Sequence, residues 1–173
     1  MPRSFFVILI LSVVFKNISA QPLSTVIKTQ AIDMGRALIN NDLPTFQQYL
    51  HPQVILQAGG AEKMKMMSDS AIAIFKQFGG SIKRISYGNP AAIVNFKKDM
   101  QTTLPQTTYI TTSFADIELE SILIAISLDK GKHWYFIDSQ LYATESMKQK
   151  MPSLSPDLVI PTPAKPRMIP KEK

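Results

Sequence analysis

The sequence predicts an α+β fold, in which helices pack on one face of a curved, mainly antiparallel sheet. Apolar residues follow a helical spacing over most of the chain up to about residue 78. Beyond residue 80 the pattern changes to runs of β-branched and aromatic residues separated by short turns. Because the two patterns are segregated along the chain, α+β is favoured over an alternating α/β arrangement, and the tight turns favour antiparallel pairing.

The first predicted helix covers residues 22–40, where apolar residues recur at steps of three and four. Its shared apolar face holds Leu23, Ile27, Ala31, Met34 and Leu38. A short second helix is expected after Asp42, a good N-cap, because Pro44 then lies near the helix start, where a missing N–H costs nothing. His51-Pro52 is expected to end this helix, since the residue before a proline avoids the helical region.

Two Gly-Gly pairs bound the third predicted helix. Val54-Ile55-Leu56 is expected to form a short strand before Gly59-Gly60, and Ala61 to Phe78 a long helix that Gly79-Gly80 ends. The apolar stripe of this helix consists of Met64, Met67, Ala71, Phe75 and Phe78. A methionine-rich stripe could form a soft ligand surface, but packing against the core is the commoner use and is what we expect.

Five strands are predicted in the second half of the chain. They cover residues 82–87, 92–96, 107–114, 118–127 and 133–138. A tight turn at Asp129-Lys130-Gly131-Lys132 joins the last two, with glycine available for a positive φ. Alternation along the last strand places Trp134, Phe136 and Asp138 on one face. We therefore expect the sole tryptophan in the core or in the wall of a cavity.

The N-terminal residues 1–20 have the pattern of a secretory signal peptide. Arg3 supplies the positive start, Phe5 to Phe15 an apolar run, and Ser19-Ala20 a small-residue cleavage site. A membrane anchor is the alternative, but an eleven-residue helix spans only about 16 Å, roughly half of a bilayer core. The mature protein is then expected to begin at Gln21 and to be exported, either periplasmic or extracellular.

The C-terminal segment 148–173 is expected to be an arm followed by a tail. It holds six of the twelve prolines, which remove backbone donors and oppose helices and central strands. Leu158-Val159-Ile160 is expected to pack on the domain as an extended arm, and the chain beyond Pro161 to be mobile. The folded domain is thereby confined to residues 21–147.

Composition and charge argue against several classes of function. The 173-residue chain has a net charge of +6, but residues 21–147 hold eleven basic and eleven acidic residues, so the excess belongs to the ends. Nucleic-acid binding is therefore not expected, because it depends on basic residues that neutralise phosphates. The absence of cysteine excludes disulfides and thiolate chemistry. Two histidines cannot make a three-histidine zinc site, and no cofactor motif is present, so we expect neither metal nor cofactor.

Three segments of the chain carry a resemblance to a known superfamily. They are the opening helix pair with its break at Asn41 to Phe46, the helix between the two Gly-Gly pairs, and the closing hairpin Ile124 to Asp138. Together they resemble the NTF2-like superfamily, also called the SnoaL or ketosteroid-isomerase-like fold, in its secreted bacterial form. The resemblance covers about residues 22–140 and implies a cone between helices and sheet. Because this fold hosts isomerases, dehydratases, cyclases, transport adaptors and binding modules, it does not assign a function.

Candidate residues for the lining of this cone are Tyr109, Trp134 and Asp138. Enzymes of the ketosteroid-isomerase type pair a carboxylate base with a tyrosine or acid that donates to an oxyanion. Asp138 shares a face with two aromatic rings and could be such a base, or it could cap the turn after the last strand. His51 is expected to hydrogen-bond a free backbone group at the helix exit, and His133 to be exposed.

The sequence thus favours an exported, non-enzymatic NTF2-like domain that binds a small molecule in the cone or a protein partner through its sheet. The alternative is an isomerase- or dehydratase-like enzyme that uses an Asp/Tyr pair in the cone. A third hypothesis is a homodimer in which the exposed sheet faces of two copies pack together, because an aromatic-rich face favours such packing. No membrane span is expected once the signal peptide is removed.

Overall fold

The computed structural model of the protein describes residues 22–171, so the predicted signal peptide at 1–20 lies outside the described residues. The helices of the first half are α1 (Leu23–Ile39), α2 (Leu43–Gln48), α3 (Pro52–Gln57) and α4 (Ala61–Gln77). The strands that follow are β1 (Ser81–Tyr87), β2 (Val94–Phe96), β3 (Asp99–Thr111), β4 (Ala115–Ser127) and β5 (Tyr135–Asp138). The chain then forms a 3-10 helix η1 (Ser139–Tyr142), α5 (Glu145–Lys148) and β6 (Arg167–Pro170). No described helix is long and apolar enough to cross a membrane.

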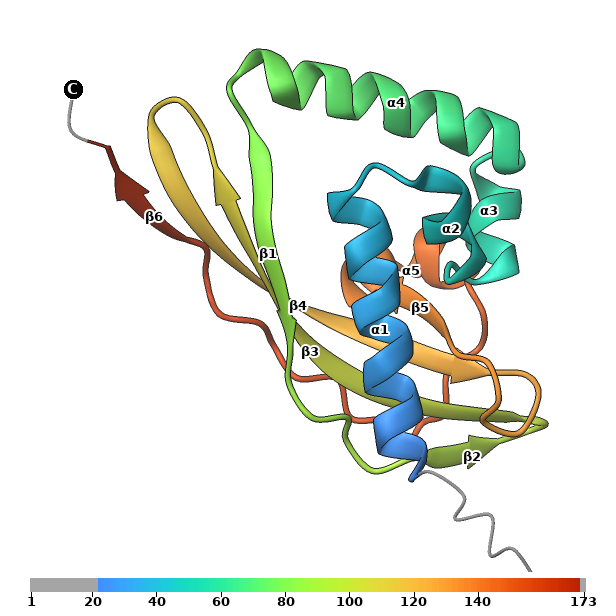
Figure 1. Ribbon diagram of the computed structural model, residues 1–173. Helices are drawn as coiled ribbons and strands as arrows, with labels where there is room; N and C mark the ends of the chain where they lie inside the picture. The colour runs from blue at the N-terminus through green and yellow to red at the C-terminus, as the bar shows by residue number, and fades with distance from the viewer. Residues whose placement is uncertain (1–21, 172–173) are drawn as a thin grey trace, which may run out of the picture.

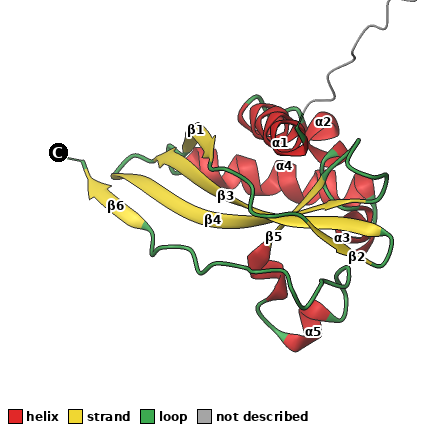
Figure 2. Ribbon diagram, turned by 90° about the horizontal axis from the view of Figure 1, so that it is seen from below, coloured by secondary structure: helices red, strands yellow, loops and turns green. Residues whose placement is uncertain are grey.

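A six-stranded antiparallel sheet forms the body of the molecule (Figure 1). Its main order is β1-β3-β4-β5, with β2 paired to β3 and β6 paired to β4. The long strands β3 and β4 pair along nearly their whole length, from Met100 opposite Ser127 to Thr111 opposite Asp116. α1 and α2 lie on one side of this sheet and α5 on the other (Figure 2). The predicted class is confirmed: the fold is α+β, and the helices of the first half lie on one side of a curved, antiparallel sheet.

Different parts of the chain cover the two faces of the sheet. The core on the helix side contains Ile27, Ala31, Met34, Leu104, Leu123, Ala125, Trp134 and Phe136. The core on the opposite face contains Ile124, Ile126, Ile137, Tyr142 and Met151. Neighbouring residues such as Leu123 and Ile124 serve different cores because successive side chains of a strand point to opposite faces. Trp134 is fully buried, which confirms its predicted place in the core.

The predicted strand at Val54-Ile55-Leu56 is wrong, because these residues belong to α3. His51-Pro52 starts this helix rather than only closing the previous one. Pro52 takes the first helical position, where no N–H is needed. His51 is the N-cap, and its Nδ1 accepts a hydrogen bond from the Gln53 N–H at 3.2 Å. The extended backbone that a proline imposes on the preceding residue suits an N-cap as well as a helix end.

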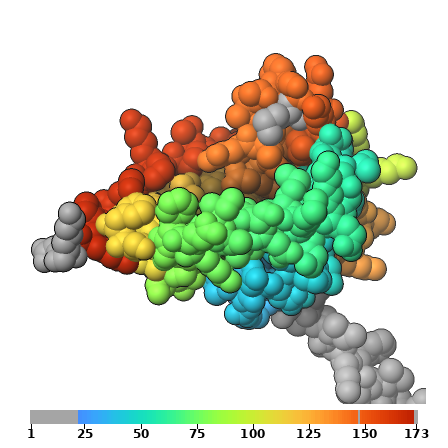
Figure 3. Space-filling model, turned by 90° about the horizontal axis from the view of Figure 1, so that it is seen from above, coloured from blue at the N-terminus to red at the C-terminus, as the bar shows by residue number. Residues whose placement is uncertain are grey.

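The expected burial of the α4 stripe is also wrong. α4 has no buried residue among those described, and the side chains of Met67 and Phe78 are 56% and 60% exposed. Only Met64, Ser68, Ile72 and Phe75 are half-buried. The helix runs across one end of the molecule, where it contacts α2 and α3, and its length is uncovered in Figure 3. α4 therefore packs against the rest of the described molecule only through these four half-buried residues.

The segment after α5 lies on the outer face of the sheet, the face opposite α1. We call residues 151–166 the C-terminal arm. The Gln101 side chain holds it at two points, donating from Nε2 to the Ser153 carbonyl (3.0 Å) and accepting at Oε1 from the Ser155 N–H (2.9 Å). Thr103 donates from its hydroxyl to the Val159 carbonyl (3.1 Å). Of the residues predicted to pack as an extended arm, Leu158 packs against the outer-face core, whereas the side chains of Val159 and Ile160 are exposed.

The chain beyond Pro161, expected to be mobile, instead adds β6 to the sheet. β5 covers only Leu123 to Ile126 of β4, which leaves the edge of its first residues open. β6 fills this edge, with Arg167 opposite Glu118 and Pro170 opposite Ala115. All four residues of β6 are exposed, so backbone pairing rather than side-chain burial places the strand. Prolines are tolerated there because β6 is an edge strand.

Candidate functional site

A hollow of about 170 Å³ lies between the helices and the sheet face that they cover. We call it the central pocket. α1 and α2 contribute Met34, Gly35, Leu38 and Phe46, and the sheet contributes Ile85, Tyr87, Gln106, Leu123, Phe136 and Asp138. Its walls are therefore mostly apolar, with three polar side chains. Strand alternation in β1, β3 and β5 turns these polar residues toward the helices.

Tyr87 provides the most unusual group in the central pocket. Its hydroxyl is buried and has no hydrogen-bond partner among the described residues. The ring reaches the backbone of α1 at Gly35, where a Cβ would collide with the hydroxyl, so this approach requires glycine. Burial raises the pKa of Tyr87 above its ordinary value. The hydroxyl therefore stays protonated and can donate a hydrogen bond.

Asp138 is the carboxylate of the pocket, and its position follows from two contacts. It pairs with Leu123 across β4 and β5, so its side chain shares the helix-covered face. The same carboxylate accepts a hydrogen bond at Oδ1 from the Gln140 N–H (2.8 Å) and caps η1. Asp138 thus takes the capping role that the sequence left open, while also lining the pocket.

Gln106 supplies the third polar group. Its Nε2 donates to the Ser121 hydroxyl at 3.2 Å and lies 3.4 Å from the Thr108 hydroxyl. These contacts on neighbouring strands fix the amide plane. The pocket accordingly presents one unpaired donor, one fixed amide and one capping carboxylate within an apolar wall. Such a set can orient a bound molecule.

Tyr109 does not join the other candidate residues. It pairs with Glu118 and Arg84, on the face of β3 that points away from the central pocket. The Arg84 guanidinium lies 4.0 Å from the centre of its ring. Tyr109 lines a groove of about 290 Å³ with Asp116 and Ile169 on the outer face. Asp138 and Trp134 therefore lie on the helix-covered face of the sheet, whereas Tyr109 lies on the outer face.

Trp134 belongs to the helix-side core and is not among the residues that line the central pocket. Its Nε1 donates to the Gly131 carbonyl at 3.1 Å, and its backbone N–H donates to the Gln30 side chain at 2.8 Å. Tyr87 and Gln106 line the pocket but are not among the residues predicted for the cone. A signal for Tyr87 was present, because alternation places it on one face with Ile85. Gln106 precedes the predicted strand 107–114 by one residue, so alternation along that strand gives no face for it.

Both histidines belong to a ring cluster outside the pocket. The His133 ring stacks on Tyr49 at 5.7 Å and meets the edge of Tyr135 at 4.6 Å, while His51 lies 5.7 Å from Tyr135. His133 is half-buried rather than exposed, and its Nε2 contacts the Gln48 carbonyl at 3.0 Å. Burial lowers the pKa of His51, and Asp99 partly opposes this. In the described residues no group of three or more acidic, histidine or cysteine side chains could hold a metal ion.

Larger hollows lie elsewhere in the described part of the molecule, and the groove beside Tyr109 is one of them. Another of about 460 Å³ lies beside η1 and the C-terminal arm, and another of about 480 Å³ beside the first turns of α1. Neither of the latter two has a carboxylate among its described lining residues. The central pocket is therefore the stronger candidate, because it combines enclosure by two layers with an unpaired buried donor.

Comparison of the chain with protein-family models, with curated proteins and with solved structures finds no match in any of the three.

Proposed function

We propose that this protein is an exported NTF2-like binding domain that holds one small, compact molecule in the central pocket without transforming it. The helical layer over one face of a curved antiparallel sheet supports the family assignment. Residues 1–20 support export. The observation that carries the binding function is the buried Tyr87 hydroxyl, which lacks a partner among the described residues. A buried donor left unpaired costs about 1–3 kcal/mol, and a ligand acceptor would remove that cost.

The size of the pocket limits the ligand. Pockets for drug-sized molecules measure about 300–1,000 Å³, and the central pocket measures about 170 Å³. An apolar cavity of about 150 Å³ accepts a benzene molecule. We therefore infer a ligand of about one ring, with an apolar body and a carbonyl or other acceptor atom that meets Tyr87. The outer sheet face is a poorer binding surface, because the C-terminal arm packs on it.

The experiment compares cyclohexanone with benzene, two probes of similar size that differ in the acceptor atom. Binding is followed by chemical shifts of pocket residues in NMR titrations. We expect cyclohexanone to bind more tightly than benzene, and Tyr87→Phe to abolish this preference, a change of about 0.5–1.5 kcal/mol or roughly two- to tenfold. Tyr109→Phe, on the other face, is the matched control and should change nothing. Equal binding of both probes by the unaltered protein would refute the proposal.

The enzymatic alternative retains one supporting observation, since Asp138 and Tyr87 line the same pocket. An isomerase-like site would remove a proton next to the carbonyl of a bound ketone. The same cyclohexanone samples in heavy water test this, because proton–deuterium exchange next to the carbonyl is visible by NMR. Our proposal predicts exchange at the buffer rate. Exchange that the protein accelerates and Asp138→Asn abolishes would establish the enzyme instead.

A further inference from the structure

α4 carries an apolar stripe that the rest of the described molecule leaves uncovered. Met67, Ile74 and Phe78 are 56%, 56% and 60% exposed, and Ala71 between them is exposed as well. Helices of soluble proteins normally bury such a stripe. Half-buried residues of α4 are confined to Met64 and to the adjoining edge at Ser68, Ile72 and Phe75. Contiguous exposed apolar surface of this kind marks an interaction site.

The spacing of the stripe is that of a helix-pairing seam. Met64, Met67, Ala71, Ile74 and Phe78 follow one another at steps of three, four, three and four. This is the heptad pattern by which two helices pack side by side. The charged residues Glu62, Lys65, Asp69 and Lys76 lie on the opposite arc, where Lys65 and Asp69 form an ion pair at 2.7 Å. The seam itself is therefore free of charge.

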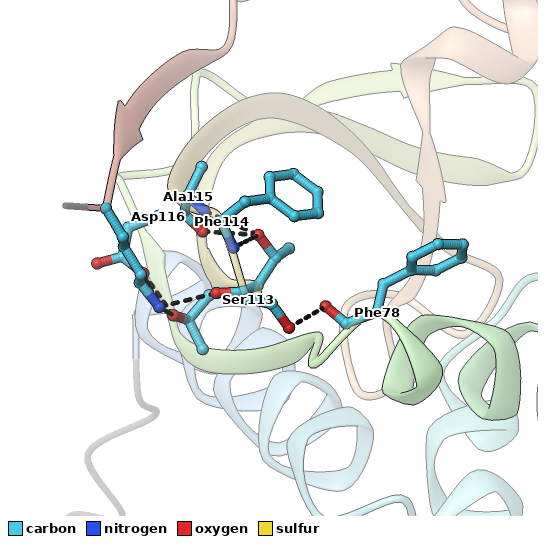
Figure 4. A network of polar contacts seen from close by, with 8 residues as sticks. Phe78, Ser113, Phe114, Ala115 and Asp116 are labelled. Carbon is cyan, nitrogen blue, oxygen red and sulfur yellow. Dashed lines mark hydrogen bonds and ion pairs between the residues drawn. The ribbon is translucent and has the colours of Figure 1, made fainter. Parts of the chain in front are cut away.

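The stripe extends past the end of α4 onto the tip of the β3–β4 hairpin. The Ser113 hydroxyl and N–H both donate to the Phe78 carbonyl, at 3.1 and 3.2 Å, which ties this tip to the helix. Phe114 is 57% exposed. Figure 4 shows the Phe78 and Phe114 rings projecting from this network to the same side. The apolar surface is thus larger than the helix alone provides.

We propose that α4 is a dimerisation helix, which pairs antiparallel with α4 of a second copy about a two-fold axis at Ala71. The stripe is nearly symmetric about this residue. In an antiparallel pair Ala71 meets Ala71 of the second copy, Met67 meets its Ile74, and Met64 meets its Phe78. The small residue at the axis lets the helices approach closely, and the larger residues pack on either side. A two-fold interface needs this self-complementarity.

Charge also favours a second copy over a lipid surface. Lys63 borders the seam, and antiparallel pairing places it opposite Gln77 of the second copy, so like charges do not meet. A helix that lies on a membrane carries a polar face rich in lysine or arginine. The polar arc of α4 instead mixes Glu62 and Asp69 with Lys65 and Lys76. With Lys63, α4 carries three basic and two acidic residues, and this net charge of +1 offers little attraction to anionic lipid.

The pairing should be weak and concentration-dependent. A seam of this length belongs to interfaces that bury less than about 1,200 Å², which are typically transient. We expect the weight-average mass of the full chain in analytical ultracentrifugation to rise from that of the monomer toward twice this value between roughly 10 μM and 1 mM. Ile74→Glu places a charge in the seam and should keep the chain monomeric. Ala73→Glu, exposed one residue away but off the seam, is the matched control and should dimerise normally.

A second measurement uses the absence of cysteine from the chain. Ala71→Cys puts its only thiol on the proposed axis, so mild oxidation should give a covalent dimer on a non-reducing gel. Ala73→Cys should cross-link much more slowly. A chain that stays monomeric at 1 mM, a dimer that tolerates Ile74→Glu, or equal cross-linking of both cysteine variants would overturn the proposal. If the protein stays monomeric and co-sediments with phosphatidylglycerol vesicles, and if Ile74→Glu abolishes this co-sedimentation, the stripe binds lipid rather than a second copy. That result would also overturn the proposal.

Discussion

Trp134 shows how one side chain joins a turn to the core. The ring has no exposed surface and packs with Phe136 in the helix-side core. Its Nε1 also donates to the Gly131 carbonyl at 3.1 Å, which ties the β4–β5 connection to the sheet. The connection therefore depends on the same residue as the packing below it.

We predict that Trp134→Ala lowers the free energy of unfolding by about 3–5 kcal/mol, the usual cost of truncating a large buried ring. Trp134→Phe should cost less, because most of the buried area is kept. Chemical denaturation of the three proteins tests this. A change within about 0.5 kcal/mol, as expected for an exposed residue, would contradict the burial of Trp134.

We expect His51 to make the stability of the protein depend on pH. It is buried, and its Nδ1 must be unprotonated to accept the Gln53 N–H. Burial lowers its pKa below the ordinary value of 6.5, against a smaller opposing effect of Asp99. Below that pH the unfolded chain binds a proton that the folded chain resists. The contribution of His51 to the free energy of unfolding is therefore fully present above about pH 6.5 and is lost as the pH falls below that value.

We predict that thermal stability decreases between pH 7 and pH 5 and that His51→Asn removes part of this decrease. Asparagine is a strong N-cap that does not titrate, so it keeps the acceptor for α3. Asp42, Asp116 and Asp129 have lowered pKa values and contribute only at more acidic pH. Melting curves at four pH values suffice, and parallel pH profiles for both proteins would rule out His51 as the source.

At the scale of elements, the C-terminal segment combines a buried part with an exposed part. Met151 is buried, and Leu154 and Leu158 pack against the same outer-face core. β6, in contrast, exposes all its side chains and is held by backbone pairing and by Lys171. The Lys171 ammonium donates to the Thr112 carbonyl at 2.8 Å and lies 3.2 Å from the Asp116 carboxylate. The two parts should therefore differ in their contribution to stability.

We predict that truncation after Pro161 lowers the free energy of unfolding by about 1–2 kcal/mol, because each net backbone hydrogen bond contributes only about 1 kcal/mol and an exposed ion pair little. Truncation after Lys150 should cost more than about 3 kcal/mol, since it uncovers a core. Denaturant unfolding of both forms measures the difference. Equal losses would show that β6, not the arm, stabilises the outer face.

At the scale of the whole molecule, the basic charge lies mainly at the ends of the chain. Residues 21–147 have no net charge, whereas residues 148–173 hold six basic and two acidic residues. Removal of the predicted signal peptide would take away Arg3 and Lys16. We predict that the exported protein has the intact mass of residues 21–173. A mass that includes residues 1–20 would contradict cleavage after Ala20.

The fold class and most of the elements follow from the amino-acid sequence, because helix and strand periodicity depend on near neighbours. The sequence also locates Trp134 in the core and Asp138 on the same strand face, since alternation within one strand is local. α3 is wrongly predicted as a strand at Val54-Ile55-Leu56, because His51-Pro52 suits the end of one helix as well as the beginning of another.

Which strand faces meet, and what covers each surface, depends on contacts between residues that are distant in the sequence. Register sets the face of every side chain in a sheet, and here it places Tyr109 away from the central pocket and Tyr87 in it. The apolar stripe of α4 predicts burial, but the helix crosses the end of the molecule, where nothing described covers it. The proline-rich segment at 167–170 has no strand signal of its own. It becomes β6 because the short β5 leaves the edge of β4 at Ala115 to Glu118 open, and free backbone groups at a sheet edge pair with whatever chain can reach them.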